Sequence, residues 1–185
     1  LPELESNIRC GNSLVGTDIY QAQLDLEGVE KYKLNAFDWM TGFPEVMGRA
    51  PAGFDVVIGN PPYFNVDDTW GRMDPRRLYL KEHYPAVYTD KTDIAYYFLY
   101  RGVQLSRSRL ALIVSRAFLE AYKAENLRAS LSAAADVVEI VDFKHYPVFP
   151  GVGIAPPIVS SQVGKRGQQG RALYRLSPPA PAPTP

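Results

Sequence analysis

Residues 54–64 read Phe-Asp-Val-Val-Ile-Gly-Asn-Pro-Pro-Tyr-Phe. The apolar run at 54–59 has the length and the β-branched composition of a buried strand. The two prolines that follow cannot continue a β-ladder, because proline lacks an N–H and has a fixed φ. In an open α/β sheet, ligands bind just beyond the carboxyl ends of the strands. The stretch therefore predicts a core strand that delivers the Asn60 amide, a constrained carbonyl and the Tyr63 ring to a ligand site.

Strand and helix patterns alternate after this stretch. A helix is expected to begin at Thr92 or Asp93, since either residue can cap it. Apolar runs predict strands at 110–114, 137–143 and 154–159. An amphipathic pattern predicts a helix at 117–131, with Phe118, Leu119, Tyr122 and Leu127 as its core side chains. This order predicts an α/β fold with mostly parallel strands and flanking helices.

The composition excludes several classes of site. The 185 residues include one cysteine, Cys10, and two histidines, so neither a disulfide framework nor a Cys- or His-rich metal site is expected. No apolar run is long enough to cross a membrane, and the start lacks a signal segment, so we expect a cytoplasmic protein without a membrane partner. The net charge is zero, but residues 101–175 hold 11 Lys and Arg against 5 Asp and Glu. This half could present a basic face to phosphates, or simply a mixed solvated surface.

The segment Asn60-Pro61-Pro62-Tyr63 resembles the catalytic motif of amino-methyltransferases that use S-adenosylmethionine (SAM). The six residues before it resemble the strand that precedes this motif in adenine-specific (N6) DNA methyltransferases, both TaqI-type and large restriction–modification enzymes. The resemblance implies a partial Rossmann-like SAM-dependent methyltransferase sheet. It also implies methyl transfer from SAM to an adenine flipped out of double-stranded DNA, and a fused or separate nuclease and target-recognition domain as partners.

The residue types of this motif suit the chemistry. The lone pair of an exocyclic amine is delocalised into the ring, so two acceptors around the nitrogen are needed to draw it out. Asn60 supplies a side-chain carbonyl, and Pro61 supplies a main-chain carbonyl that Pro62 restricts. Tyr63 offers a flat face for the base.

A second aromatic wall is expected near the end of the domain. Val148-Phe149-Pro150-Gly151 resembles the last catalytic motif of the family, in which a phenylalanine packs on the flipped base. Phe149 holds that position here. The alternative is an ordinary core phenylalanine at the end of a strand.

Two residues are candidates for contact with the cofactor. Gly11-Asn12-Ser13-Leu14 resembles a family segment whose acidic or amide residue hydrogen-bonds the adenine of SAM, which implies that role for Asn12. The same four residues also fit a simple exit from a strand. Asp38 is the second candidate, within Phe37-Asp38-Trp39, where dense aromatic residues predict either a wall over a pocket or an anchored surface loop.

Residues 65–92 form a long polar stretch with basic and aromatic side chains interleaved. Such a stretch suits a loop that meets nucleic acid, and it equally suits a disordered connection.

The resemblance covers about residues 1–160, and we interpret residues 1–163 as a partial catalytic domain. A Gly-rich SAM-binding segment is not found in these residues, and the chain lacks an initiator methionine, so we expect that segment upstream. Residues 164–185 are rich in Pro and Gly and predict an extended or disordered tail. We therefore expect the chain alone neither to bind SAM well nor to methylate DNA.

Two other interpretations stay open. Protein-glutamine N5-methyltransferases share the Asn-Pro-Pro-Tyr motif, because a carboxamide nitrogen poses the same problem. The long polar stretch after Tyr63 and the Phe149 turn argue against them. The chain could also be a non-catalytic DNA-binding remnant.

Overall fold

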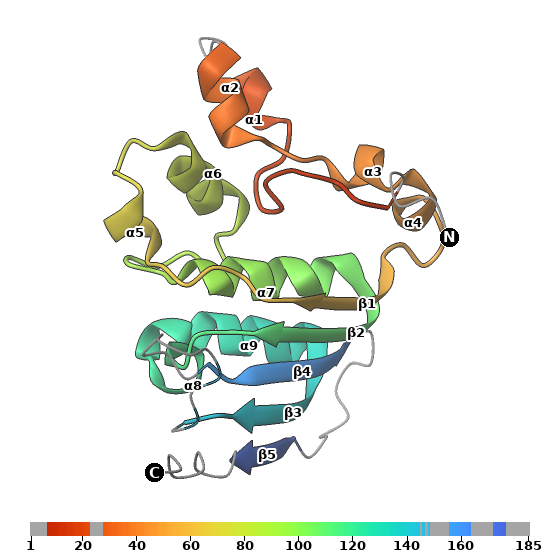
Figure 1. Ribbon diagram of the computed structural model, residues 1–185, viewed down its shortest axis with the longest axis vertical. Helices are drawn as coiled ribbons and strands as arrows, with labels where there is room; N and C mark the ends of the chain where they lie inside the picture. Colours follow the sequence, from red (N-terminus) through yellow and green to blue (C-terminus); the bar gives the residue numbers. More distant parts are fainter. Residues whose placement is uncertain are drawn as a thin grey trace, which may run out of the picture.

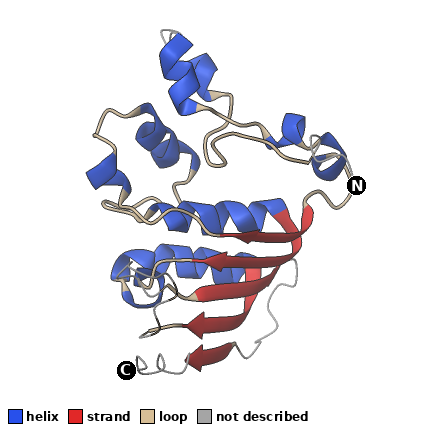
Figure 2. Ribbon diagram, in the orientation of Figure 1, coloured by secondary structure: helices blue, strands red, loops and turns tan. Residues whose placement is uncertain are grey.

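The computed structural model describes residues 7–22, 28–144, 146, 148, 156–163 and 172–176. A five-stranded sheet forms the centre of the molecule, with helices around it (Figures 1 and 2). The strands are β1 (Phe54–Gly59), β2 (Ser106–Ile113), β3 (Ala135–Asp142), β4 (Ile158–Val163) and β5 (Leu173–Leu176).

The strand order is β1-β2-β4-β3-β5. β1 is parallel to β2 and β3 is parallel to β5, while β4 is antiparallel to both of its neighbours, β2 and β3. Four of the five described strands therefore run in one direction. The predicted α/β fold with mostly parallel strands and flanking helices is confirmed.

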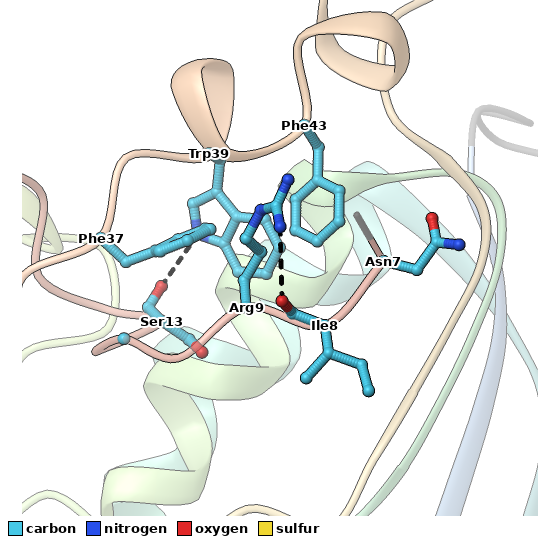
Figure 3. Close-up of a pocket in the computed structure, with 8 residues that line it drawn as sticks. Asn7, Ile8, Arg9, Ser13, Phe37, Trp39 and Phe43 are labelled. Atoms are coloured by element: carbon cyan, nitrogen blue, oxygen red, sulfur yellow. Dashed lines mark hydrogen bonds between the residues drawn. The ribbon is translucent and has the colours of Figure 1, made fainter. Parts of the chain in front are cut away.

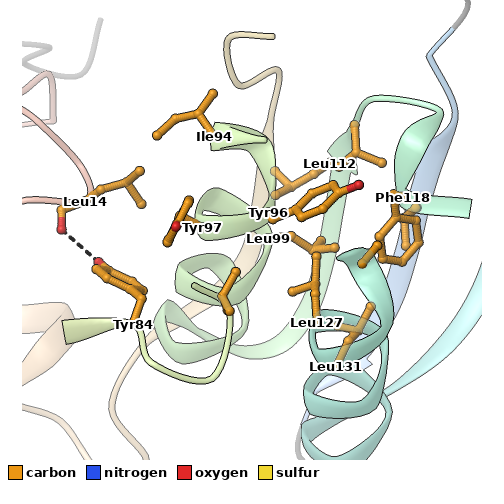
Figure 4. Close-up of a cluster of buried hydrophobic side chains, with 14 of the residues drawn as sticks. Leu14, Tyr84, Ile94, Tyr96, Tyr97, Leu99, Leu112, Phe118, Leu127 and Leu131 are labelled. Atoms are coloured by element: carbon orange, nitrogen blue, oxygen red, sulfur yellow. Dashed lines mark hydrogen bonds between the residues drawn. The ribbon is translucent and has the colours of Figure 1, made fainter. Parts of the chain in front are cut away.

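Two helices build the main core from one face of the sheet. α7 (Ile94–Leu105) begins at its cap Asp93, as expected, and packs against α9 (Glu125–Ala134) and β2. Figure 4 shows the side chains that meet there, including the fully buried Leu99. Gly102 permits this close approach, because a Cβ at this position would lie 2.7 Å from Leu110 Cδ1.

β1 is less buried than the sequence predicts. Val56 and Ile58 are 58% and 76% exposed, because β1 lies at the edge of the described sheet and α7 covers only its other face. The prediction of a strand is confirmed, and the prediction that this strand is buried is wrong for Val56 and Ile58.

The single helix expected at 117–131 is interrupted. It divides into α8 (Ala117–Glu120), the 3₁₀ turn η1 (Tyr122–Ala124) and α9, because Ala121 is extended, with φ −69° and ψ 133°. The break turns Tyr122 away from the core, so its side chain is 78% exposed. The prediction of Tyr122 as a core residue is wrong.

The end of the chain also differs from expectation. The strand expected at 154–159 is β4, which begins only after Pro156 and Pro157, because neither can donate to a ladder. Within the predicted tail, Leu173–Leu176 form β5, paired with β3. Tyr174 fixes this strand through its hydroxyl, which donates to the buried Asp142 carboxylate at 2.6 Å.

The N-terminal segment packs as a smaller unit above the main core. Its helices are α1 (Ile19–Ala22), α2 (Gly28–Leu34), α3 (Trp39–Gly42) and α4 (Pro44–Met47). Val15, Ile19 and Leu34 form a separate cluster of buried side chains. Two tyrosines fasten the segment, since Tyr84 donates to the Leu14 carbonyl at 2.8 Å and Tyr79 to Asp18 Oδ1 at 2.9 Å.

Residues 65–92 are ordered rather than a disordered connection. They form α5 (Val66–Thr69) and α6 (Pro75–His83), capped by the side chains of Asn65 and Asp74. Val66 and Leu80 are buried in the main core. Across the described ranges, no helix is long and apolar enough to span a membrane.

Candidate active site

The loop Asn60–Phe64 follows the carboxyl end of β1 and is held by backbone hydrogen bonds on its far side. The Ile94 N–H donates to the Phe64 carbonyl, and the Val66 N–H donates to the Thr92 carbonyl, both at 3.0 Å. These two hydrogen bonds hold residues 64–66, which follow Tyr63, against the start of α7. Pro61 is buried and Asn60 is exposed. The loop is therefore held at both ends, while the side-chain amide of Asn60 stays accessible to solvent.

Asn60 and Tyr63 are joined directly. The Tyr63 hydroxyl donates to Asn60 Oδ1 at 2.8 Å. An amide oxygen has two lone pairs, so one remains for a second donor. Burial raises the pKa of the Tyr63 hydroxyl, and the nearby Asp93 carboxylate raises it further. Tyr63 therefore keeps its proton at neutral pH and remains a donor to Asn60.

Asp93 is a site neighbour that the sequence identifies only as a helix cap. Its Oδ1 accepts a hydrogen bond from the Ala95 N–H at 2.9 Å. Asp93 forms a β-bridge with Asn65, which brings it beside the loop Asn60–Phe64. Burial raises the pKa of its carboxyl above the ordinary value. A charged group at a helix start is common, so no signal in the sequence alone distinguishes this aspartate from any other cap.

A cavity of about 270 Å³ lies against the loop; we call it the loop cavity. One side consists of Gly59, Asn60, Pro61 and Pro62, and the other sides consist of Ser13, Trp39, Val57, Ile58, Phe98, Arg101, Gly102, Leu105 and Leu112. The N-terminal segment and α7 thus both reach the predicted catalytic residues.

A second cavity, of about 330 Å³, lies beside the first; we call it the aromatic cavity (Figure 3). It is lined by Asn7, Ile8, Arg9, Gly11, Ser13, Phe37, Trp39 and Phe43. Ser13 and Trp39 belong to both cavities. The Trp39 indole N–H donates to the Ser13 carbonyl at 3.2 Å. This hydrogen bond fixes the indole ring between the two cavities.

The rings of the aromatic cavity support one another. Phe37 meets Trp39 edge-on at 5.1 Å between centroids, and Phe43 stacks on Trp39 at 6.0 Å. Phe43 also meets Phe54 of β1 at 5.3 Å. The dense aromatic residues around Asp38 therefore form a wall over a pocket, one of the two outcomes that the sequence predicts.

Asn12 and Asp38 lie in two adjacent segments next to this wall. A parallel bridge joins Asn12 to Ala36, and Asn12 Oδ1 accepts from the Leu14 N–H at 3.1 Å. Asp38 caps α3, with Oδ1 accepting from the Thr41 N–H at 2.8 Å. That backbone hydrogen bond lowers the pKa of the Asp38 carboxyl. Both side chains shape local turns, and their contact with a cofactor stays a prediction.

Phe149, the predicted second wall for the base, lies outside the described residues. The roles of Asn60, Pro61, Pro62 and Tyr63 also stay predictions. One loop carries all four, and the first three line the loop cavity. Among the residues that the structure describes, no group of three or more His, Cys, Asp or Glu side chains is arranged to hold a metal ion.

The basic side chains of residues 65–92 are partly neutralised. Arg76 pairs with Asp74 at 2.6 Å and lies over the Trp70 ring, 4.5 Å from its centroid. Arg77 forms an ion pair with Asp67. These two arginines support α5 and α6, so their charges are less available to a nucleic acid than the sequence suggests.

Comparison with known proteins adds a family. The model of the Eco57I restriction-modification methylases matches residues 3–149. A type II restriction enzyme and methyltransferase of Escherichia coli, RM.Eco57I, is 28% identical over 152 residues, which cover 80% of this chain. The chain spans only 14% of the length of that relative.

One solved structure supports the fold. It is a putative class I S-adenosylmethionine-dependent methyltransferase from Listeria monocytogenes, with a TM-score of 0.53 and 12% sequence identity. The similarity covers 67% of this chain and 36% of the other. At this identity the likeness concerns the arrangement of strands and helices alone.

Proposed function

This chain belongs to the Eco57I restriction-modification methylase family, and from that premise we propose that it carries the target-base half of a SAM-dependent, adenine-specific (N6) DNA methyltransferase. One observation carries the proposal. The loop after β1 lines a cavity with Asn60 and Pro61, and it joins Asn60 to Tyr63 by a hydrogen bond.

Asn60 and Pro61 act on the amine of the target adenine. Asn60 Oδ1 and the Pro61 carbonyl accept hydrogen bonds from its two N–H groups, which favours a tetrahedral nitrogen with a free lone pair. These bonds strengthen as positive charge develops on the nitrogen, so they stabilise the transition state more than the bound substrate. Pro62 restricts the backbone at Pro61 and thereby fixes the direction of its carbonyl.

Tyr63 holds the base that has left the DNA stack. Its ring offers one face, and Phe149 is proposed for the other. Stacking on an aromatic side chain contributes about 1–3 kcal/mol per base, which offsets part of the cost of unpairing. The hydroxyl of the same tyrosine keeps the Asn60 amide oriented, through the 2.8 Å bond to Oδ1.

The aromatic cavity fits an adenine ring, because Phe37, Trp39 and Phe43 line a space of about 330 Å³. Asn12 and Asp38 do not line this cavity, but each lies between two lining residues in the chain, and we propose both for the polar edge of that ring. SAM, when bound, supplies the methyl group. Because Trp39 and Ser13 belong to both cavities, a cofactor held in the aromatic cavity lies next to the loop cavity.

The partners follow from this chemistry. Double-stranded DNA with a flipped adenine is the substrate, and a nuclease and a target-recognition domain, fused or separate, complete the system in the cytoplasm. RM.Eco57I is described as both a restriction enzyme and a methyltransferase, which supports an association of the two activities.

The test uses the natural full-length protein with SAM labelled in the methyl group. Plasmid DNA and total cell protein are offered as acceptors, and methylated bases are identified by mass spectrometry. We expect label in N6-methyladenine. Label in a protein glutamine would support the glutamine methyltransferase instead.

Asn60→Ala separates catalysis from binding. We expect kcat to fall by about 10²–10³, as for the loss of one transition-state hydrogen-bond partner, with DNA affinity kept. Asn126→Ala is the matched control, because this asparagine is exposed on α9 and lines neither cavity. Unchanged methylation by the Asn60 variant would overturn the proposal.

A further inference from the structure

The turn η1, which comes after β2 and α8 in the chain, presents an exposed aromatic ring. Tyr122 is 78% exposed, and it follows β2 and α8 in the chain. Single exposed hydrophobic side chains are common on protein surfaces, so exposure alone assigns no role. Tyr122 differs from such side chains in two respects, namely how firmly its turn is held and where that turn lies.

The turn that carries Tyr122 is rigidly held. Arg128 Nη1 donates to the carbonyl of Phe118, within α8, at 2.8 Å and to the carbonyl of Ala121, at the break between α8 and η1, at 3.1 Å. Phe118 and Ala124 are buried at 3% and 0% exposure. A ring on such a turn is already in place before a partner arrives, so little conformational entropy is lost when it binds.

The turn and the residue that follows the loop Asn60–Phe64 both bind the same backbone segment, residues 90–91. Lys123 Nζ donates to the Asp90 carbonyl at 2.8 Å. The next carbonyl along that segment, of Lys91, accepts from Asn65 Nδ2 at 2.6 Å, and Asn65 lies two residues beyond Tyr63. In Figure 1, α8 and α5 lie on the side of the sheet toward which the arrows of β1 and β2 point, at the carboxyl ends of these strands. DNA that delivers a base to Asn60 approaches the same side.

The chemistry of the turn suits a nucleic acid strand. The Lys123 ammonium lies 5.8 Å from the centroid of the Tyr122 ring. An aromatic face next to a cation is the combination that binds unstacked bases and their phosphates. We propose that Tyr122 stacks on a base left exposed in the DNA when the target adenine flips into the loop cavity. The inference rests on the proposed function.

The experiment measures binding and flipping separately in the natural full-length protein. The methylated site is first mapped on plasmid DNA. A 30-base-pair duplex containing that site then carries 2-aminopurine at the target position, whose fluorescence rises when the base leaves the stack. Duplex affinity is measured by fluorescence anisotropy.

We expect Tyr122→Ala to weaken duplex binding roughly tenfold, within the range of one lost base–aromatic contact, and to reduce the 2-aminopurine signal. Tyr122→Phe keeps the ring and should match the wild type in both measurements. Tyr32→Ala is the matched control, since Tyr32 is 85% exposed on α2, at the other end of the molecule in Figure 1.

The outcomes distinguish this inference from the proposed function. If the wild type methylates adenine and Tyr122→Ala equals it in affinity and flipping, the role of Tyr122 is overturned and the function stands. A wild-type protein that neither methylates nor binds plasmid DNA overturns both. Equal losses in the Tyr122 and Tyr32 variants also overturn the inference, because they indicate a general surface effect.

Discussion

The two cavities share Trp39 and Ser13, yet they are built in different ways. The loop cavity is lined by β1, its following loop and α7, which belong to the main core around Leu99 and Leu110. The aromatic cavity is lined by the N-terminal segment, whose helices α1, α3 and α4 each have four residues and whose separate cluster has three buried side chains. The difference teaches that the predicted base site is held by the core, while the predicted cofactor site is held by ring-to-ring contacts and a few hydrogen bonds. Substitutions in the two regions test this contrast.

The first test is a substitution of Trp39, which lines both cavities. Trp39→Ala removes a ring from both cavities together with its contacts to Phe37 and Phe43. We expect SAM affinity of the full-length protein to fall by more than tenfold, because an aromatic surface of this size is lost. Isothermal calorimetry measures the affinity, and Trp70→Ala, a ring outside both cavities, is the control. Equal affinities for SAM would show that the aromatic cavity does not hold the cofactor.

Two leucines compare the stability of the two regions with the same chemical change. Leu99→Ala in α7 should lower the free energy of unfolding by about 2–5 kcal/mol, because a fully buried side chain leaves a cavity. Leu34→Ala in the small N-terminal cluster should cost less and loosen only that segment. Denaturant titration measures the free energy of unfolding of each variant. Amide hydrogen exchange locates the segment that loosens in the Leu34 variant. Global unfolding of equal size in both variants would contradict the contrast.

Two substitutions of Tyr63 separate the contribution of its ring from that of its hydroxyl. Tyr63→Ala loses the proposed stacking face, and we expect kcat/KM to fall roughly tenfold to a hundredfold. Tyr63→Phe keeps the ring and removes only the bond to Asn60, so a fall of about fivefold is expected, as for one hydrogen bond of about 1 kcal/mol. Steady-state methylation of DNA measures both. A phenylalanine variant as impaired as the alanine variant would mean that the hydroxyl, and not the ring, carries the function.

The smallest effect distinguishes the two aspartate caps by pH. Burial raises the pKa of Asp93, so the folded state holds its proton more tightly than the unfolded chain, and this group costs stability as the pH rises through the raised pKa. The pKa of Asp38 is lowered by its backbone hydrogen bond, so this group adds stability above its unfolded pKa and loses it as the pH falls. Asp93→Asn should therefore gain stability relative to wild type as the pH rises above about 4, through the raised pKa of Asp93. Asp38→Asn should lose stability relative to wild type as the pH rises toward about 4 from below, because only the wild type gains from ionisation there. Urea titrations on both sides of about pH 4 decide the signs.

Much of this architecture could be predicted, because strong local patterns determined it. The run at 54–59 and the cap at Asp93 each carry a signal within a few residues, and both elements form where expected. The loop that brings Asn60 to Tyr63 follows from two prolines that stop a strand. Tertiary effects explain the failures. Residues 117–131 have helical periodicity throughout, but the Arg128 guanidinium binds the carbonyls of Phe118 and Ala121 beside the break.

The errors at the ends of the sheet have a similar cause. Leu173–Leu176 are surrounded by glycine and proline residues, and only the partner strand and the buried Asp142 explain why they are extended and paired. The closeness of Asp93 to Tyr63 was equally hidden, because it depends on a bridge between segments whose separation in space no local pattern encodes.

The late position of β4 in the chain has a consequence for biosynthesis. β4 fills the gap between β2 and β3, yet its residues 158–163 leave the ribosome after both neighbours. Until then, β2 and β3 each present an unpaired edge, which is a template for association with other chains. The nascent protein therefore passes through a stage in which the centre of its sheet is open, between the emergence of residue 142 and that of residue 163.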